Sequence, residues 1–123
     1  MNRLPQYFLT LAVLAALIGM AWGLQMAISN DHLLAPAHAH LNLVGWVSLS
    51  LFAFYYHLMP AAAASGLAKA HLGLAASGVI LMVPGIAIAI SGGGEPLAAI
   101  GSILTLLSML TFGAVLLRHG LRH

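Results

Sequence analysis

The chain has 123 residues, of which 62% are hydrophobic and only 5% are charged. This balance is too apolar for a water-soluble domain, and the length allows a single domain. The net charge of +2 comes from scattered residues, so a nucleic-acid-binding role is excluded, and the absence of cysteine excludes disulfides and thiol chemistry. We therefore expect one integral membrane domain over residues 1–123, with the lipid bilayer as its surroundings.

Four stretches without charged side chains are long enough to cross about 30 Å of hydrocarbon, which takes roughly 20 residues. Proline, glycine and charged residues separate these stretches and set their ends. The sequence predicts an all-α, integral membrane four-helix bundle, with its helices at about 6–28, 37–58, 69–90 and 96–118.

The few charges predict how the helices are oriented. Basic residues occur at the N-terminus, in the second loop and at the C-terminus, whereas acidic residues occur in the first and third loops. In that order they are Arg3, Lys69, Arg118 and Arg122, then Asp31 and Glu95. Because positive charges stay on the cytoplasmic side, we expect a multi-pass protein of a bacterial-type inner membrane with both termini in the cytoplasm.

Small residues and helix breakers indicate how the helices pack. Trp22, near the outer end of the first helix, suits the membrane interface. In the third helix, Pro84-Gly85 predicts a kink or local unwinding, because proline removes a backbone hydrogen bond. The fourth helix carries small and hydroxyl residues that predict a close-packed seam, namely Gly101, Thr105, Ser108 and Thr111.

Seven histidines are unusual in so apolar a chain, because polar groups at membrane depth are costly and tend to be functional. Pro36 suits the start of a helix, so His38 and His40 fall on the first turn of the second helix. Residues two apart on a helix point about 200° apart, so this pair cannot clamp one ion but can serve two sites. Neutral imidazole ligates heme iron, copper or zinc; the alternative is interfacial histidines bonded to loops or headgroups.

Two further histidines are expected near the inner membrane surface. His57 and His71 could form a second site, or serve packing or proton handling. At 1.5 Å per residue, roughly 25 Å separates His40 from His57, so one heme cannot join the outer and inner histidines of one chain. Tyr55 and Tyr56 predict an aromatic belt at the inner rim.

Three runs of residues carry a resemblance to a known family. They are His38-Ala-His40-Leu-Asn-Leu-Val-Gly45-Trp46-Val, then Tyr55-Tyr56-His-Leu-Met-Pro60, then Leu67-Ala-Lys-Ala-His71-Leu-Gly-Leu-Ala-Ala-Ser-Gly78-Val-Ile-Leu. In this order they resemble subunit I of heme-copper oxidases. The similarity is greatest to C-type oxidases and nitric oxide reductases, around their tenth and eleventh transmembrane helices.

The resemblance implies a role for each outer histidine. His38 matches the family histidine that ligates the high-spin, gas-binding heme, and His40 matches the one that ligates the low-spin heme. His71 matches a family histidine without an assigned ligand role, and both His71 and His57 are weaker ligand candidates. The helices that carry the copper-binding histidines of the family have no counterpart in this chain, so oxidase turnover by a monomer is not expected.

The family also suggests how copies of the chain could assemble. Subunit I has twelve helices in three arcs of four, and this chain resembles one arc. The resemblance therefore implies a homotrimer that rebuilds the ring, with His38 of one copy and His40 of the next as axial ligands of heme b. Such a protein would carry electrons, with a redox partner that the sequence does not identify, or bind NO or O₂.

Two other functions remain open at this point. A copper- or zinc-binding or transport protein would need further ligands beside the histidines, and only Met20, Met26 and Asp31 are candidates. A structural assembly subunit would use the histidines for packing alone. Enzymatic turnover is not predicted, because the two carboxylates, Asp31 and Glu95, lie in outer loops and no nucleophile is paired with a base.

Overall fold

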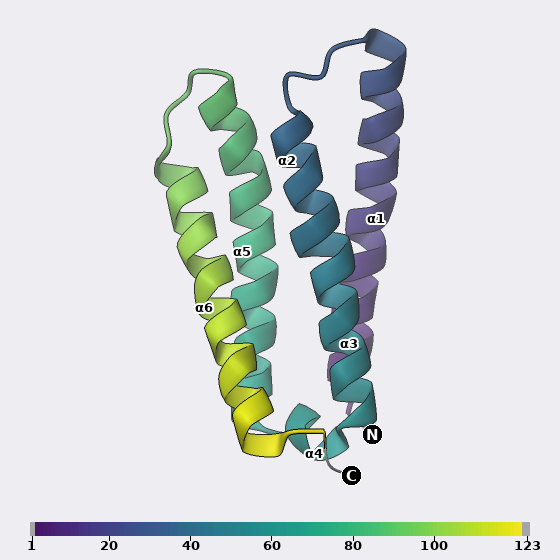
Figure 1. The fold of residues 1–123 in the computed structure, drawn as a ribbon, viewed down its shortest axis with the longest axis vertical. Coiled ribbons are helices and arrows are strands. Elements are labelled where there is room, and N and C mark those ends of the chain that lie inside the picture. Colours follow the sequence, from purple (N-terminus) through teal and green to yellow (C-terminus); the bar gives the residue numbers. More distant parts are fainter. Residues whose placement is uncertain (1, 122–123) are drawn as a thin grey trace.

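The computed structural model describes residues 2–121, and within that range the chain is helical apart from short connections. Four helical segments are long and apolar enough to cross a membrane, and they run alternately up and down (Figure 1). The first is α1, Leu4–Ser29, and the last two are α5, Gly66–Ile90, and α6, Pro96–His119. The all-α, four-helix prediction is confirmed. Arg122 and His123 lie outside the described residues.

The second span is assembled from three consecutive pieces. These are α2, Ala35–His40, the π-helical segment η1, Leu41–Val47, and α3, Ser48–Leu58. A four-residue helix, α4, Pro60–Ala63, then leads into α5. The π segment was not predicted, because a change of helical period over seven residues is hard to see in a span that is apolar on most faces.

The ends of the helices follow from local residue chemistry. Asn30 adopts a left-handed conformation, with φ of 56°, and this conformation ends α1. The Ser65 hydroxyl accepts a hydrogen bond from the Ala68 amide and caps α5, which begins at Gly66 instead of the predicted Lys69. The loops at residues 30–34 and 91–95 lie at one end of the bundle, and the start of α1 and the end of α6 lie at the other (Figure 1).

The α5–α6 hairpin packs through glycines. An added Cβ at Gly78 would lie 2.6 Å from Oγ1 of Thr105, and at Gly85 it would meet the backbone of Ala98. Gly101 and Ser108 are buried on the facing side of α6, which confirms the predicted seam there. The helix α5 continues through Pro84 without a break, so the predicted local unwinding is wrong. Neighbouring helices support a proline within a membrane helix.

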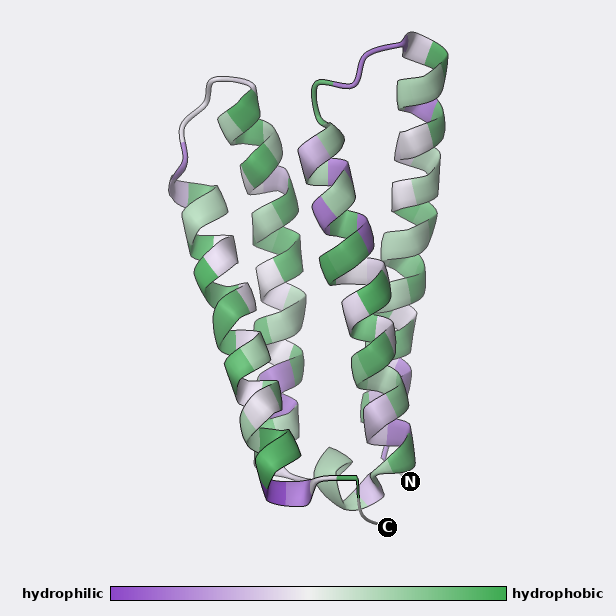
Figure 2. Cartoon of the chain, viewed as in Figure 1, coloured by the Kyte–Doolittle hydropathy of each residue, from purple (hydrophilic) through white to green (hydrophobic). Residues whose placement is uncertain are grey.

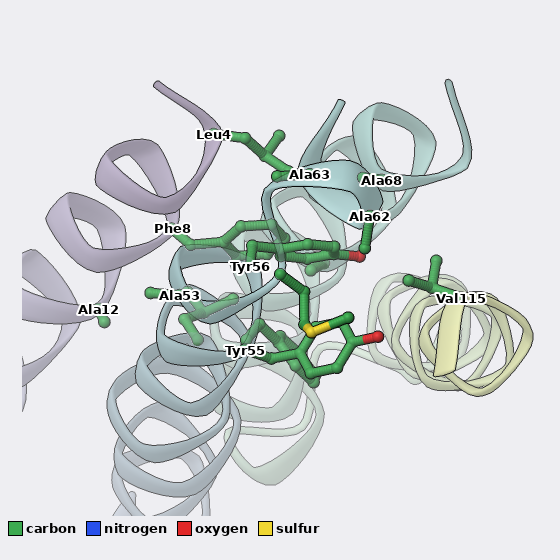
Figure 3. Close-up of a cluster of buried hydrophobic side chains, with 14 residues drawn as sticks. Leu4, Phe8, Ala12, Ala53, Tyr55, Tyr56, Ala62, Ala63, Ala68 and Val115 are labelled. Carbon is green, nitrogen blue, oxygen red and sulfur yellow. The ribbon is translucent and has the colours of Figure 1, made fainter. Parts of the chain in front are cut away.

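The core is concentrated at the end of the bundle that holds α4, which we call the inner end; the end with the loops at residues 30–34 and 91–95 we call the outer end. Phe8 of α1, Phe52 and Tyr56 of α3 and Val115 of α6 meet there in one cluster, seen in close-up in Figure 3. Tyr55 and Tyr56 are both buried, so the prediction of an aromatic belt at the inner rim is wrong. The outer surfaces of all four spans are mainly apolar, and hydrophilic residues gather towards their ends (Figure 2).

Candidate functional site

The two histidines of the His-Ala-His triplet sit at the outer end of the second span. Pro36 lies in the first turn of α2, where its missing amide proton costs nothing, and the His38 amide donates to the Leu34 carbonyl at 3.0 Å. The π segment begins directly after His40. Such segments often occur at functional sites, where they re-aim side chains.

The His40 imidazole is exposed and held by a single hydrogen bond. Its Nδ1 lies 2.7 Å from the carbonyl oxygen of Pro36, one turn earlier on the same helix. A carbonyl only accepts hydrogen bonds, so the proton of the neutral ring is on Nδ1. The lone pair on Nε2 is therefore free, and the ring is oriented for ligation of a metal.

The His38 imidazole is half-buried and faces α1. Its Nε2 lies 2.9 Å from the carbonyl oxygen of Gly19, so this nitrogen carries the proton and donates it. The ring also packs edge-on against Trp22, with 6.0 Å between the ring centroids. The Asn42 amide nitrogen is 3.3 Å from the same Nε2, a contact that adds little because both nitrogens carry protons.

The two imidazoles of the triplet therefore differ in environment. His38 is turned onto α1, whereas His40 is exposed, as expected for residues that point about 200° apart. In the described part of the chain, no three histidine or acidic side chains gather closely enough to hold a metal ion. The Nε2 of His38 thus meets the backbone of α1, whereas the Nε2 of His40 is exposed.

The candidate copper ligands also differ from one another in environment. Met20 on α1 is 71% exposed, whereas Met26 is buried, and Asp31 is in the exposed outer loop. The Asp31 carboxylate accepts a hydrogen bond from the Leu33 amide and so serves the loop. Met20 lines a shallow cavity of about 250 Å³ between α1 and η1, together with Asn42.

The inner histidines do not share an environment either. His71 is fully buried, and its Nδ1 lies 2.9 Å from the hydroxyl oxygen of Tyr56. Its Nε2 is also buried and has no hydrogen-bond partner. His57 follows Tyr56 in the sequence but is exposed. His71 thus contacts Tyr56 and not His57, the partner expected from the sequence.

Three phenylalanine rings complete the surroundings of His71. Phe52 is nearest, with 4.4 Å between ring centroids, and Phe8 and Phe112 lie at 5.1 and 5.3 Å. Each ring comes from a different helix, α1, α3 or α6. The imidazole is therefore a packing centre that joins all four spans at the inner end.

Comparison of the chain with family models, with curated proteins and with solved structures gave no match. The ligand environments described above therefore rest on the geometry of this chain alone. Sequence reasoning missed Tyr56 as the partner of His71 and Asn42 as the neighbour of His38. The four-residue spacing from His38 to Asn42 could have indicated the second contact, because such residues are neighbours on a helix.

Proposed function

We propose that this chain is a heme b-binding membrane protein in which His40 supplies an axial ligand to iron. One observation carries the proposal: the Nδ1 of His40 donates to the Pro36 carbonyl, and Nε2 is left exposed with a free lone pair. Ligating histidines are usually held in this manner, because the bond at the second nitrogen fixes the tautomer and raises the basicity of the ligand.

The side chains beside His40 suit a flat apolar macrocycle. Leu43, Trp46 and Val47, on the following turns, are all exposed and apolar. The chain carries no arginine or lysine between Arg3 and Lys69, so the heme propionates would remain in water at the outer surface. Histidine-ligated heme iron supplies reversible electron transfer, or the binding of a diatomic gas where one axial position is open.

The remaining parts of the proposal rest on the resemblance to heme-copper oxidases and on the distribution of charge. A second copy of the chain would supply the other side of the heme pocket. A homotrimer rebuilds the twelve-helix ring of the family, with His38 of a neighbouring copy as the candidate second ligand. The positive charges favour an inner membrane location with both termini in the cytoplasm.

An absorption spectrum of the purified protein tests this function. After expression with added heme precursor, we expect a Soret band and reduced α and β bands of heme b. His40→Ala should lose these bands, whereas His32→Ala, which changes an exposed loop histidine, should keep them. A protein without a Soret band, or with an unchanged spectrum in both His38→Ala and His40→Ala, would contradict the proposal.

A further inference from the structure

The surface of α1 that faces His38 lacks side chains at two positions one turn apart. An added Cβ at Gly23 would lie 3.2 Å from Nε2 of His38, and an added Cβ at Gly19 would collide with the Asn42 side chain. These two glycines thus leave a recess of the size of the imidazole and the amide. Such closely spaced small residues usually admit a neighbouring helix backbone, whereas here they admit polar side chains.

A hydrogen bond fixes the imidazole in this recess. The Nε2 of His38 donates to the Gly19 carbonyl at 2.9 Å, and the second lone pair of that oxygen can keep its helical bond. The Trp22 ring packs against the same imidazole in an edge-to-face arrangement. The Nε2–H of His38 is partly buried, so loss of the Gly19 carbonyl would leave this donor only incompletely satisfied by water, and the hydrogen bond favours the held position of the ring.

We infer that this recess on α1 is a holding site for His38, and that His40 alone is the resident axial ligand of the bound heme. The second half of the inference rests on the proposed function and narrows it: His40 stays the ligand, and His38 of the neighbouring copy is no longer the candidate second ligand. With His38 of every copy held by its own Gly19, one side of the iron stays open. An open axial position binds small neutral diatomic molecules, so the inference favours gas binding over electron transfer between two histidines.

The holding site can be tested without heme. Histidine side chains labelled with ¹⁵N report which ring nitrogen carries the proton, in heme-free protein in lipid nanodiscs. We expect a proton on Nε2 of His38 and on Nδ1 of His40, with each signal assigned by its loss in the His→Gln variant. A proton on Nδ1 of His38, or averaging between its two tautomers, would overturn the holding site.

The same glycine-to-alanine change at two positions, one in the recess and one away from it, provides a test with a matched control. Gly23→Ala places a Cβ 3.2 Å from Nε2 of His38, so the ring must move by a few tenths of an ångström and the hydrogen-bonded Nε2–H signal should shift and weaken. Gly73→Ala makes the same chemical change on α5, where no atom lies within 4 Å of the new Cβ, and should leave that signal unchanged. An unchanged signal in both variants would show that the recess does not hold the ring.

The ligand assignment is tested in the heme-loaded, reduced protein by a carbon monoxide difference spectrum. We expect five-coordinate iron and saturable carbon monoxide binding in the wild type, unchanged binding in His38→Ala, and loss of heme in His40→Ala. Six-coordinate, low-spin iron that becomes five-coordinate in His38→Ala would overturn the assignment. Failure to take up any heme would overturn the proposed function and this assignment together, while the tautomer of His38 would still decide the holding site.

Discussion

His71 and Tyr56 illustrate how a polar pair can be buried completely inside an apolar bundle. Their 2.9 Å hydrogen bond joins α5 to α3, and rings from three helices cover the imidazole. The hydrogen bond satisfies Nδ1 of His71 and the Tyr56 hydroxyl, whereas the buried Nε2 of His71 has no partner. The bond therefore specifies which face of α3 meets α5, and the phenylalanines supply the packing.

Removal of the Tyr56 hydroxyl should destabilise the protein modestly. Hydrogen bonds between membrane helices contribute about 0.6 kcal/mol on average and up to about 1.7, so we expect Tyr56→Phe to cost about 1 kcal/mol. Denaturation in a graded detergent mixture measures this loss. Tyr7→Phe, at a position that is 52% exposed, is the control and should have no effect. Equal stability of the two variants would show that the hydrogen bond between Tyr56 and His71 contributes nothing to the stability of the protein.

At the scale of the elements, the π segment sets the direction of the triplet relative to the rest of the second span. The seven residues of η1 lie between His40 and α3, and each π turn holds more residues than an α turn. The Ser48 hydroxyl donates to the Leu43 carbonyl at 2.8 Å, which satisfies a backbone acceptor within the segment. The rotation of His38 towards α1 thus depends on a local feature of the backbone.

Insertion of one alanine after Leu43 tests the importance of this segment. The wide turns of η1 already hold extra residues, so one more residue should turn the triplet by up to about 100° relative to α3. We expect loss of the His38–Gly19 hydrogen bond, read from the ¹⁵N signal of His38, and loss of heme. Leu43→Ala keeps the residue count and should retain the hydrogen bond. Retention of this bond in the insertion variant would mean that the register of η1 is unimportant.

The α5–α6 hairpin makes a second prediction at this scale. Gly78→Ala would place a Cβ 2.6 Å from Thr105, so we expect a loss of about 1–3 kcal/mol from overpacking. Gly73→Ala meets no atom within 4 Å and should stabilise α5 by about 0.5–1 kcal/mol, because alanine favours helix more than glycine does. Thermal unfolding in detergent compares them. The hairpin packing described here would be wrong if Gly78→Ala were as stable as Gly73→Ala.

At the scale of the whole molecule, the two ends of the bundle differ in character. The inner end is closed by the aromatic cluster around His71, and the Tyr55 hydroxyl donates to the Gly120 carbonyl at 2.8 Å. At the outer end, by contrast, His40 is exposed beside a loop that is itself exposed. The proposed ligand site therefore lies at the accessible end of the bundle, away from the closed aromatic cluster.

The orientation in the membrane can be tested directly, because the chain contains no cysteine. We expect His32→Cys, in the outer loop, to react with a membrane-impermeant maleimide on intact cells. Ala64→Cys, in the exposed turn before α5, should react only after permeabilisation. The physical reason is that Lys69 lies near Ala64 and that positive residues stay on the cytoplasmic side. The reverse pattern of labelling would place both termini outside the cytoplasm.

The sequence by itself determined the fold class, the number of spans and the place of His38 and His40 at the start of the second span. Helix starts at Pro36 and Pro96 were predictable because the effects of proline depend on neighbouring residues alone, whereas the cap at Ser65 was not predicted. The opposite directions of the two histidines followed from helical geometry in the same way.

Only the tertiary structure decided what each histidine meets. The bond from His38 to Gly19 and the burial of His71 beside Tyr56 join different spans, so no local pattern contains them. The π segment is also a feature that only the structure revealed, because a change of helical pitch leaves the composition of the span unaltered. Local chemistry decides where helices begin and end, whereas contacts between helices decide which imidazole is held and which is free.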